Sequence, residues 1–130
     1  MNYYQTEILR IKSERFSNEW QIEKAISTRQ FIESNFDNSV TLDVLARTQF
    51  TSKYHLLRLY KKYYGQTPKQ FLTDVRIEKA KLLLRAGISV TETCFSVGFE
   101  NPGSFSSLFK GRTGMTPSEF QKRATFAKSD

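Results

Sequence analysis

The stretch that decides the fold of this chain occurs twice. Residues 65–71 read G-Q-T-P-K-Q-F, and residues 114–120 read G-M-T-P-S-E-F. The Gly, Thr, Pro and Phe of the second copy each lie 49 positions after their counterparts in the first. Identity at one fixed offset indicates a duplicated unit. The question is which unit a chain of 130 residues needs twice.

Each copy has the chemistry of a boundary between two helices. Gly65 and Gly114 suit the left-handed conformation that commonly follows a helix end. Thr is a good N-cap and Pro is favoured at the first helical position, while a Gln or Glu three residues after the Thr completes a capping box. We therefore expect one helix to end before each Gly and another to begin at each Pro. Phe71 and Phe120 would then fix the new helices to the core.

Caps and apolar spacing recur along the whole chain and predict an all-α fold of seven helices. The expected helices open at these residues, in order: Asn18, Thr41, Ser52, Thr67, Ser89, Asn101 and Thr116. The expected organisation is an N-terminal segment at 1–17, linker-like or a packed helix, then a first subdomain at 18–66, a central helix at 67–87 and a second subdomain at 88–127.

The residues ahead of each G-x-T-P show the pattern of a helix-turn-helix, in which a short helix, a tight turn and a second helix follow one another. The first is L-A-R-T-Q-F-T-S-K-Y-H-L-L-R-L-Y-K at 45–61, and the second is T-C-F-S-V-G-F-E-N-P-G-S-F-S-S-L-F-K at 93–110. The small residues Ala46 and Cys94 stand where crossing helices approach closely, and Gly98 marks the second turn. We predict two homeodomain-like three-helical units joined by the long central helix.

The distribution of charge points to a polyanionic partner. Residues 1–43 carry five Lys or Arg against seven Asp or Glu, whereas residues 44–130 carry fifteen against six. Between Asp43 and Asp74 there are six basic residues and no acidic one. A solvated helix face explains a lone run of charge about equally well. The duplicated helix-turn-helix favours double-stranded DNA, because such a unit exposes one face of its second helix to the major groove.

The predicted DNA contacts are the outward residues of the two second helices: Lys53, Tyr54, Leu57, Arg58, Lys61 and Lys62 in the first unit, and Gly103, Ser104, Ser106, Ser107 and Lys110 in the second. Arg58 suits a bidentate contact with guanine, and the lysines suit phosphates. A central helix of about twenty residues spans ~30 Å, close to the ~34 Å of one DNA turn. A monomer is therefore expected to reach two successive major grooves.

Other classes of function find little support. Cys94 and His55 are the only residues of their kinds, so the chain offers no internal disulfide and no cluster of metal ligands. We predict no enzyme activity, no cofactor and no metal. Cys94 is expected to be a packed residue, with a reactive thiol that accepts alkyl groups as a distant alternative. The sequence has no run of ~18 apolar residues and no secretion signal, so a cytoplasmic protein without a membrane partner is expected.

Two further segments have alternatives that the sequence leaves open. Arg76 on the central helix is expected to bind a helix end or an acid such as Asp74 or Glu78, in preference to DNA. Residues 3–16 carry apolar side chains at helical spacing. They would either pack on the domain or form the tail of a preceding domain, and the sequence does not decide between a stand-alone regulator and the output end of a longer chain.

The motifs resemble the DNA-binding domain of the AraC/XylS family of bacterial transcription regulators over roughly residues 20–124. The matching stretches are L-A at 45–46, S-K-Y-H-L-L-R-L-Y-K at 52–61, G-x-T-P-x-x-F at 65–71, R-I-E-K-A-K-L-L-L at 76–84, V-G-F at 97–99, F-S-S-L-F-K at 105–110 and G-M-T-P-S-E-F at 114–120. The resemblance implies promoter DNA as partner and RNA polymerase as a possible second one. It places the DNA-reading positions at Lys53, Tyr54, Leu57 and Arg58, and at Pro102, Gly103, Ser104, Ser106 and Ser107.

The two units differ in their charge, which leads to two hypotheses. The acid-free run between Glu100 and Glu119 holds only Lys110 and Arg112, and Ser107 stands where the family often has Arg. We hypothesise that the first unit dominates specific affinity and that the second acts through phosphates and DNA shape. The rival hypothesis is a DNA-binding or protein-interaction output module of a longer sensor protein, with little base reading by its second unit.

Overall fold

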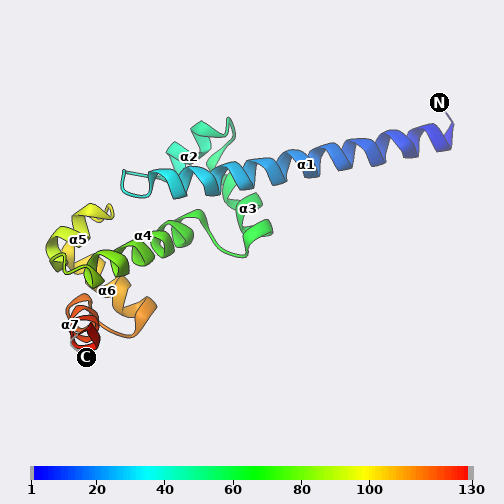
Figure 1. Cartoon of the computed structure of the whole chain (residues 1–130). Coiled ribbons are helices and arrows are strands. Elements are labelled where there is room, and N and C mark those ends of the chain that lie inside the picture. The colour runs from blue at the N-terminus through cyan, green and yellow to red at the C-terminus, as the bar shows by residue number, and fades with distance from the viewer. Residues whose placement is uncertain (1, 129–130) are drawn as a thin grey trace.

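The computed structural model describes residues 2–128, with side chains through Thr125, and this range forms seven α-helices and no strand (Figure 1). The helices are α1 (Tyr3–Asn35), α2 (Leu42–Thr48), α3 (Lys53–Tyr64), α4 (Pro68–Arg85), α5 (Val90–Ser96), α6 (Pro102–Thr113) and α7 (Pro117–Lys128). The all-α prediction is confirmed. None of the described helices combines the length and apolarity that a membrane crossing requires.

The repeated G-x-T-P motif ends one helix and starts the next in both units. Gly65 closes α3 with φ of 70° and Gly114 closes α6 with φ of 81°, both in the left-handed region. The hydroxyl of Thr67 accepts a hydrogen bond from the Gln70 amide, and the Gln70 side chain accepts one from the Thr67 amide. Thr116 and Glu119 make the same reciprocal pair at the start of α7. These caps satisfy backbone donors that a helix start otherwise leaves unpaired.

The expected N-cap of the first helix at Asn18 is wrong, because α1 begins at Tyr3 and its N-cap lies sixteen residues earlier. Its N-cap is Asn2, which forms a complete capping box with Gln5. The sequence N-x-x-Q occurs at both places, and neither Gly nor Pro interrupts residues 3–35. With no residue to break the helix, the first capping box starts it and Asn18 lies within it.

The first half of α1 extends away from the rest of the protein (Figure 1). The side chains of Tyr4, Ile8 and Ile11 are 75%, 52% and 48% exposed. Of the two alternatives left open for this segment, packing on the domain is therefore not observed for these three side chains. Within the helix, Arg10 forms ion pairs with Glu7 and Glu14 at 2.8 and 3.2 Å, which are spacings that support a solvated helix.

Two separate hydrophobic cores share the central helix. The first joins α1, α2, α3 and the start of α4, and its buried residues are Ala25, Ile32, Leu45, Ala46, Leu56, Leu59, Tyr60, Phe71 and Leu72. The second joins the rest of α4 to α5 and α6, with buried residues Ile77, Ala80, Leu84, Cys94, Val97, Phe99, Phe105 and Phe109, and Phe120 of α7 packs against it. Since α4 contributes buried side chains to both cores, it is an integral part of both units and not only a linker between them.

Arg76 of α4 joins the two units at the point where the cores meet. Its Nε donates a hydrogen bond to the carbonyl of Phe36 at 2.7 Å, and its Nη2 donates to the carbonyl of Asn38 at 2.9 Å. Phe36 is the C-cap of α1, so the expectation that Arg76 binds a helix end is confirmed. The two acids that were the alternative bind elsewhere, Asp74 to Arg112 and Glu78 to Lys81.

Two glycines of the second unit test this description of helix ends. Gly111 lies inside α6 with nothing near the position of an added Cβ, whereas Gly114 at the end of α6 has φ of 81°. We expect Gly111→Ala to raise the free energy of unfolding by about 0.5–1 kcal/mol. We expect Gly114→Ala to lower it by about 1–2 kcal/mol, because a side chain is strained in the left-handed region. Urea denaturation of both variants measures the difference, and equal effects would contradict the assignment of the cap.

Candidate nucleic-acid interface

The two helix-turn-helix units are built on the same backbone pattern. In the first turn the amide of Phe50 donates to the Arg47 carbonyl and that of Thr51 to the Ala46 carbonyl, at 3.2 and 3.0 Å. In the second, the amides of Gly98 and Phe99 bond the carbonyls of Phe95 and Cys94, at 3.2 and 3.1 Å. The equivalent residues here are 48 positions apart. The N-caps that follow, Ser52 and Asn101, are 49 apart, so the second turn is one residue longer.

Phe50 occupies the left-handed position of the first turn, where the second turn has Gly98. Its φ is 53°, and it is the only described non-glycine residue with a positive φ. Its side chain is 91% exposed, so burial does not offset this strain. The Lys24 ammonium holds the turn from the side of α1, since it donates to the Gln49 carbonyl and lies over the rings of Trp20 and Phe50. No pattern in the sequence predicted the contact between Lys24 and this turn.

The predicted reading face of α3 is largely solvent-accessible. Its exposed members are Lys53, Tyr54, Arg58, Lys61 and Lys62, whereas the opposite face buries Leu56, Leu59 and Tyr60 in the first core. Leu57 differs from the others because it is half-buried and lines a groove between the units. His55 is half-buried as well and lies beside Trp20, with ring centroids 5.8 Å apart. The arrangement leaves four basic side chains on the free surface of α3.

The corresponding face of α6 is small and polar. Pro102, Gly103, Ser104, Ser107 and Lys110 are exposed and Ser106 is half-buried, while Phe105 and Phe109 fill the second core. The Asn101 side chain caps the helix by accepting from the amides of Gly103 and Ser104 at 2.7 and 3.2 Å. Helix α6 can therefore approach a partner closely with its backbone.

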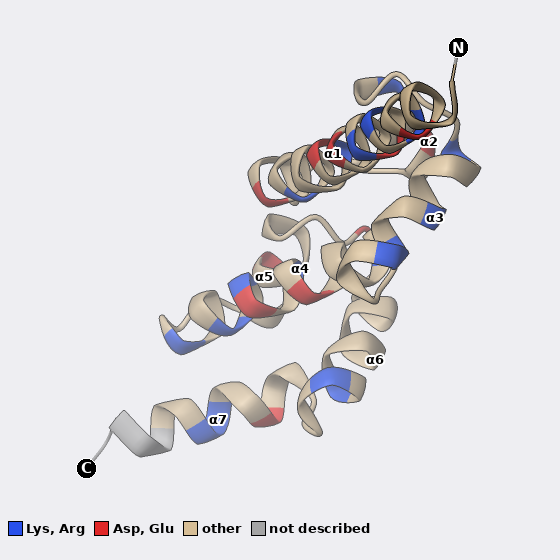
Figure 2. Ribbon diagram, turned by 90° about the vertical axis from the view of Figure 1, so that its right-hand side faces the viewer, with Lys and Arg blue, Asp and Glu red and all other residues tan. Residues whose placement is uncertain are grey.

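The helices α3 and α6 lie on the same side of the molecule, with α7 directed away from that side (Figure 2). Helix α4 contacts both of them. Lysine and arginine lie along α3 in the figure, whereas α1 and α4 carry charges of both signs. The outward faces of the two second helices thus belong to one surface.

Ion pairs make the two units more different in charge than the sequence suggested. Arg112 of α6 forms a 2.8 Å ion pair with Asp74 of α4. Of the two basic residues between Glu100 and Glu119, only Lys110 has no ion pair in the described structure. In the first unit Lys53 lies 3.8 Å from Asp43, a long contact between exposed groups that contributes little. Lys62 is turned towards α1, where its ammonium lies 3.5 Å from Gln21 Oε1.

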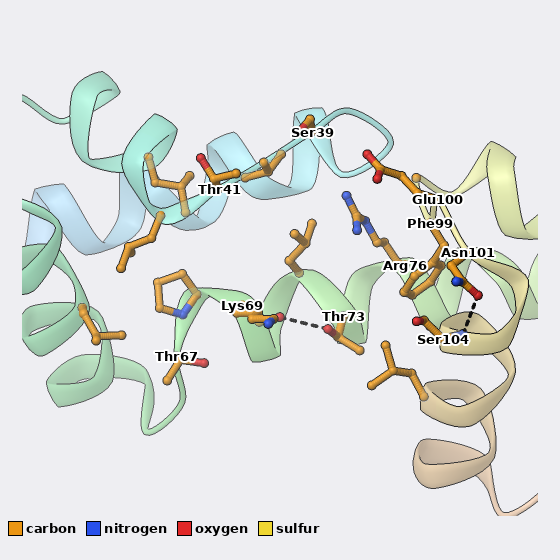
Figure 3. A pocket seen from close by; sticks show the side chains of 18 residues that line it. Ser39, Thr41, Thr67, Lys69, Thr73, Arg76, Phe99, Glu100, Asn101 and Ser104 are labelled. Atoms are coloured by element: carbon orange, nitrogen blue, oxygen red, sulfur yellow. Dashed lines mark hydrogen bonds between the residues drawn. The ribbon is translucent and has the colours of Figure 1, made fainter.

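A groove of about 850 Å³ separates the two units on the surface of α4 (Figure 3). Leu57 of α3 and Ser104 and Leu108 of α6 line its opposite sides. Leu72, Thr73 and Arg76 of α4 also line it, together with Gly98 and Phe99 of the second turn. Both second helices therefore border the same hollow.

Burial shifts the pKa of two titratable side chains in the cores. Cys94 is fully buried, its thiol lies 3.9 Å from the Phe99 carbonyl, and burial raises the pKa of the thiol. A raised pKa disfavours the nucleophilic thiolate, so the alternative of a reactive thiol gains no support. Burial raises the pKa of Tyr60 to about 12, with the positive charge of Arg29 acting in the opposite direction. The Tyr60 hydroxyl is buried close to Arg29 but, within the described residues, makes no hydrogen bond of regular geometry.

Comparisons with known proteins agree with this geometry. A family profile described as a helix-turn-helix domain matches residues 45–123. An uncharacterised helix-turn-helix transcriptional regulator from the cgkA 5′ region of Pseudoalteromonas carrageenovora is 37% identical over 92 residues, which are 71% of this chain and 55% of that protein. The chain spans about half the length of the curated relatives it matches, 55% of the first and 44% of a second.

Solved structures share the fold over most of the chain. A probable AraC family transcriptional regulator from Rhodopseudomonas palustris superposes with a TM-score of 0.71 and 28% identity, covering 78% of this chain and 97% of that one. The DNA-binding domain of the transcription factor AdpA, solved in complex with a target DNA, gives a TM-score of 0.76 at 20% identity over 82% of this chain and 96% of that one. At that identity the second likeness concerns the fold alone.

The paired units, their shared surface and these likenesses define a DNA-binding domain with two helix-turn-helix units. The chain belongs to the AraC/XylS family of bacterial transcription regulators.

The environment of Tyr60, on the buried face of α3, leads to a test by pH. The unfolded tyrosine loses its proton near pH 10, whereas the folded one keeps it until about 12. Stability is therefore lost as pH rises through this window, by about 2 kcal/mol for a shift of this size. We expect Tyr60→Phe to lose less stability between pH 10 and 12 than the wild type.

At pH 7 the same variant is expected to be as stable as the wild type, or more stable by up to about 1 kcal/mol, because it removes a buried hydroxyl that makes no hydrogen bond of regular geometry. Chemical denaturation of both proteins at pH 7 and across pH 10–12 measures the effect. The other five tyrosines are present in both proteins, so their contributions cancel in the comparison. A Tyr60→Phe protein that is strongly destabilised at pH 7 would contradict this description.

Proposed function

We propose that the chain regulates transcription by sequence-specific binding to double-stranded DNA, with α3 and α6 inserted into two successive major grooves. The observation that carries the proposal is the position of these two helices, which present their outward faces on one side of the molecule (Figure 2). A protein of the same fold, the DNA-binding domain of AdpA, was solved in complex with a target DNA. A monomer would engage both grooves, and recruitment of RNA polymerase follows from the family resemblance alone.

The length of α4 bears on the shape of the bound DNA. Its 18 residues span ~27 Å, which is less than the ~34 Å between successive major-groove entries on one face of straight B-DNA. A rigid connection of this length favours DNA that bends towards the protein, at a cost that depends on sequence. The proposal therefore includes a contribution from DNA deformability at bases between the two half-sites.

Most of the specific affinity is assigned to α3. Arg58 is exposed there and carries the five-donor guanidinium that matches the edge of guanine. Lys53 and Lys61 flank it at phosphate-binding positions. On α6 the reading positions are occupied by proline, glycine and serine, and Arg112 is bound to Asp74. We assign to α6 a close backbone approach and phosphate contacts through Lys110.

Leu57 remains a proposed DNA contact, but with a different role from the fully exposed residues of α3. Because it is half-buried at the edge of the groove, it would contact a sugar or a thymine methyl and not extend fully into the major groove. Ser104 borders the groove from α6. The two residues would face the DNA backbone that passes between the two half-sites.

The asymmetry between the units is tested with a matched pair of truncations. We expect Arg58→Ala to weaken binding to the preferred site by about 1–3 kcal/mol, because it removes a bidentate guanine contact. We expect Ser107→Ala to weaken it by less than about 1 kcal/mol, since a serine hydroxyl makes at most one neutral hydrogen bond. Titration of each variant against the wild-type site and a site with the contacted guanine replaced measures both. A larger loss for Ser107→Ala refutes the asymmetry.

The second candidate function is an output module of a longer protein, which binds DNA through phosphates or binds another protein with little base reading. The part of the relatives' length that this chain spans and the small polar face of α6 favour it. Selection from random duplexes in competition separates the two. We expect enrichment of a bipartite consensus that survives ~200 mM salt, whereas a phosphate-only binder shows no consensus and loses affinity steeply with salt.

A further inference from the structure

We propose that Arg76 is a positioning residue that fixes the separation of α3 and α6, and thereby the spacing of the two half-sites that the protein accepts. This inference rests on the proposed binding of two successive grooves. Arg76 belongs to neither reading face, and its side chain is directed to the joint between the units (Figure 3).

The guanidinium of Arg76 makes polar contacts that connect three segments of the chain. It extends from α4 and donates to the carbonyls of Phe36 and Asn38, which end α1 and begin the loop to α2. On its other side it lies over the ring of Phe99, 5.4 Å from the centroid. Phe99 follows the turn after α5 and is buried in the second core. Arg76 thus holds the end of α1 against the second unit, together with Phe36, which packs against both cores.

Each recognition helix is tied to one side of this joint. Helix α3 packs on α1, so its place in the first unit depends on where α1 ends. The N-cap of helix α6 is Asn101, two residues after Phe99. A change at Arg76 therefore moves the second turn relative to the end of α1 and carries α6 with it.

Gly98 shows how tightly the joint is packed. An added Cβ on Gly98 would lie 2.7 Å from the Phe36 carbonyl oxygen and 3.0 Å from both Nε and Nη2 of Arg76. The φ of Gly98 is 99°, which a side chain rarely tolerates. The second turn therefore lies directly against the bond between Arg76 and Phe36, and only glycine leaves room for it.

The chemistry of the joint requires a guanidinium. Burial lowers the pKa of Arg76, and the charges of Glu100 and Asp37 act in the opposite direction. Arginine remains charged in proteins and presents several donors in a rigid plane, so that two of its nitrogens serve two carbonyls at once. Lysine supplies the charge from a single point and cannot reproduce the fork. The two carbonyls at the end of α1 select arginine for this position.

A rigid joint has a direct effect on binding to a bipartite site. When the two units are held at the correct separation, binding of the second unit follows binding of the first at high effective concentration. A loose joint lowers that concentration at the correct spacing and also reduces the penalty at incorrect spacings. The spacing profile therefore reports on positioning, whereas a general loss of stability lowers affinity at every spacing alike.

The test uses the consensus selected with the wild-type chain, in duplexes with the half-sites at the preferred spacing and one or two base pairs closer or farther apart. A duplex with a single half-site completes the series. Arg76→Ala is compared with Arg76→Lys and with Arg123→Ala, which removes the same charge from an exposed position on α7. We expect Arg76→Ala to bind the preferred spacing about tenfold more weakly, with a flattened spacing profile and an unchanged affinity for the single half-site.

The controls set the limits of the result. Arg123→Ala is expected to keep the wild-type profile, and Arg76→Lys to fall between the two. If Arg76→Ala loses affinity for the single half-site and for every spacing by the same factor, the positioning role is overturned. If the wild-type protein itself selects no bipartite site, the proposed function is wrong. That result comes from the wild type alone and is therefore distinct from a failure of the Arg76 variants.

A distance measurement on the protein without DNA tests the role of Arg76 even if the wild type selects no bipartite site. Spin labels are attached at Glu23→Cys on α1 and Lys122→Cys on α7, both exposed positions, while Cys94 is buried and inaccessible to the label. We expect a narrow distribution of distances between the labels in the wild-type background and a broad one in Arg76→Ala. Gly98→Ala is expected to broaden it as well. Equally narrow distributions in all three proteins would overturn the proposal.

Discussion

The bond between the Arg76 guanidinium and the Phe36 carbonyl is the constraint on which the arrangement of the two units depends. Each unit has its own core, and α4 contributes to both. A shared helix fixes the distance between the cores along its axis, and the packing of each unit on α4 sets their rotation about that axis. The fork from Arg76 to the end of α1, with the second turn packed on it through Gly98 and Phe99, adds a polar link between the units to that packing. We propose that this contact keeps the outward faces of α3 and α6 on one surface.

The duplication preserved the framework and changed the surface. Both units keep the glycine helix end, the Thr-Pro start and the close crossing at Ala46 or Cys94. The outward faces have diverged, since α3 presents Tyr54, Arg58 and several lysines whereas α6 presents glycine and serine. Helix geometry is set by residues that face inwards or cap the ends, so the exposed positions are free to change. The different faces suggest that the units divide the recognition of DNA between them.

Local signals in the sequence predicted the helices well, whereas contacts between distant residues required the structure. Caps such as Thr67 and Asn101 act within three or four residues, and a reader of the sequence sees both partners together. The error at Asn18 arose because two identical N-x-x-Q patterns compete and the earlier one starts the helix. The partner of Arg76 lies 40 residues away, and the pairing of Arg112 with Asp74 spans 38. Among the candidate contact residues, exposure was foreseen for Lys53, Arg58 and Ser107 from helical spacing. The partial burial of Leu57 was not, because it depends on how the two units meet.

Hydroxyl-radical footprinting of the selected site tests most directly whether both recognition helices engage DNA. The account predicts two protected patches, about one helical turn apart, on the same face of the duplex, with the stronger protection where α3 binds. Protection confined to a single patch, at a concentration that saturates the site, would contradict it.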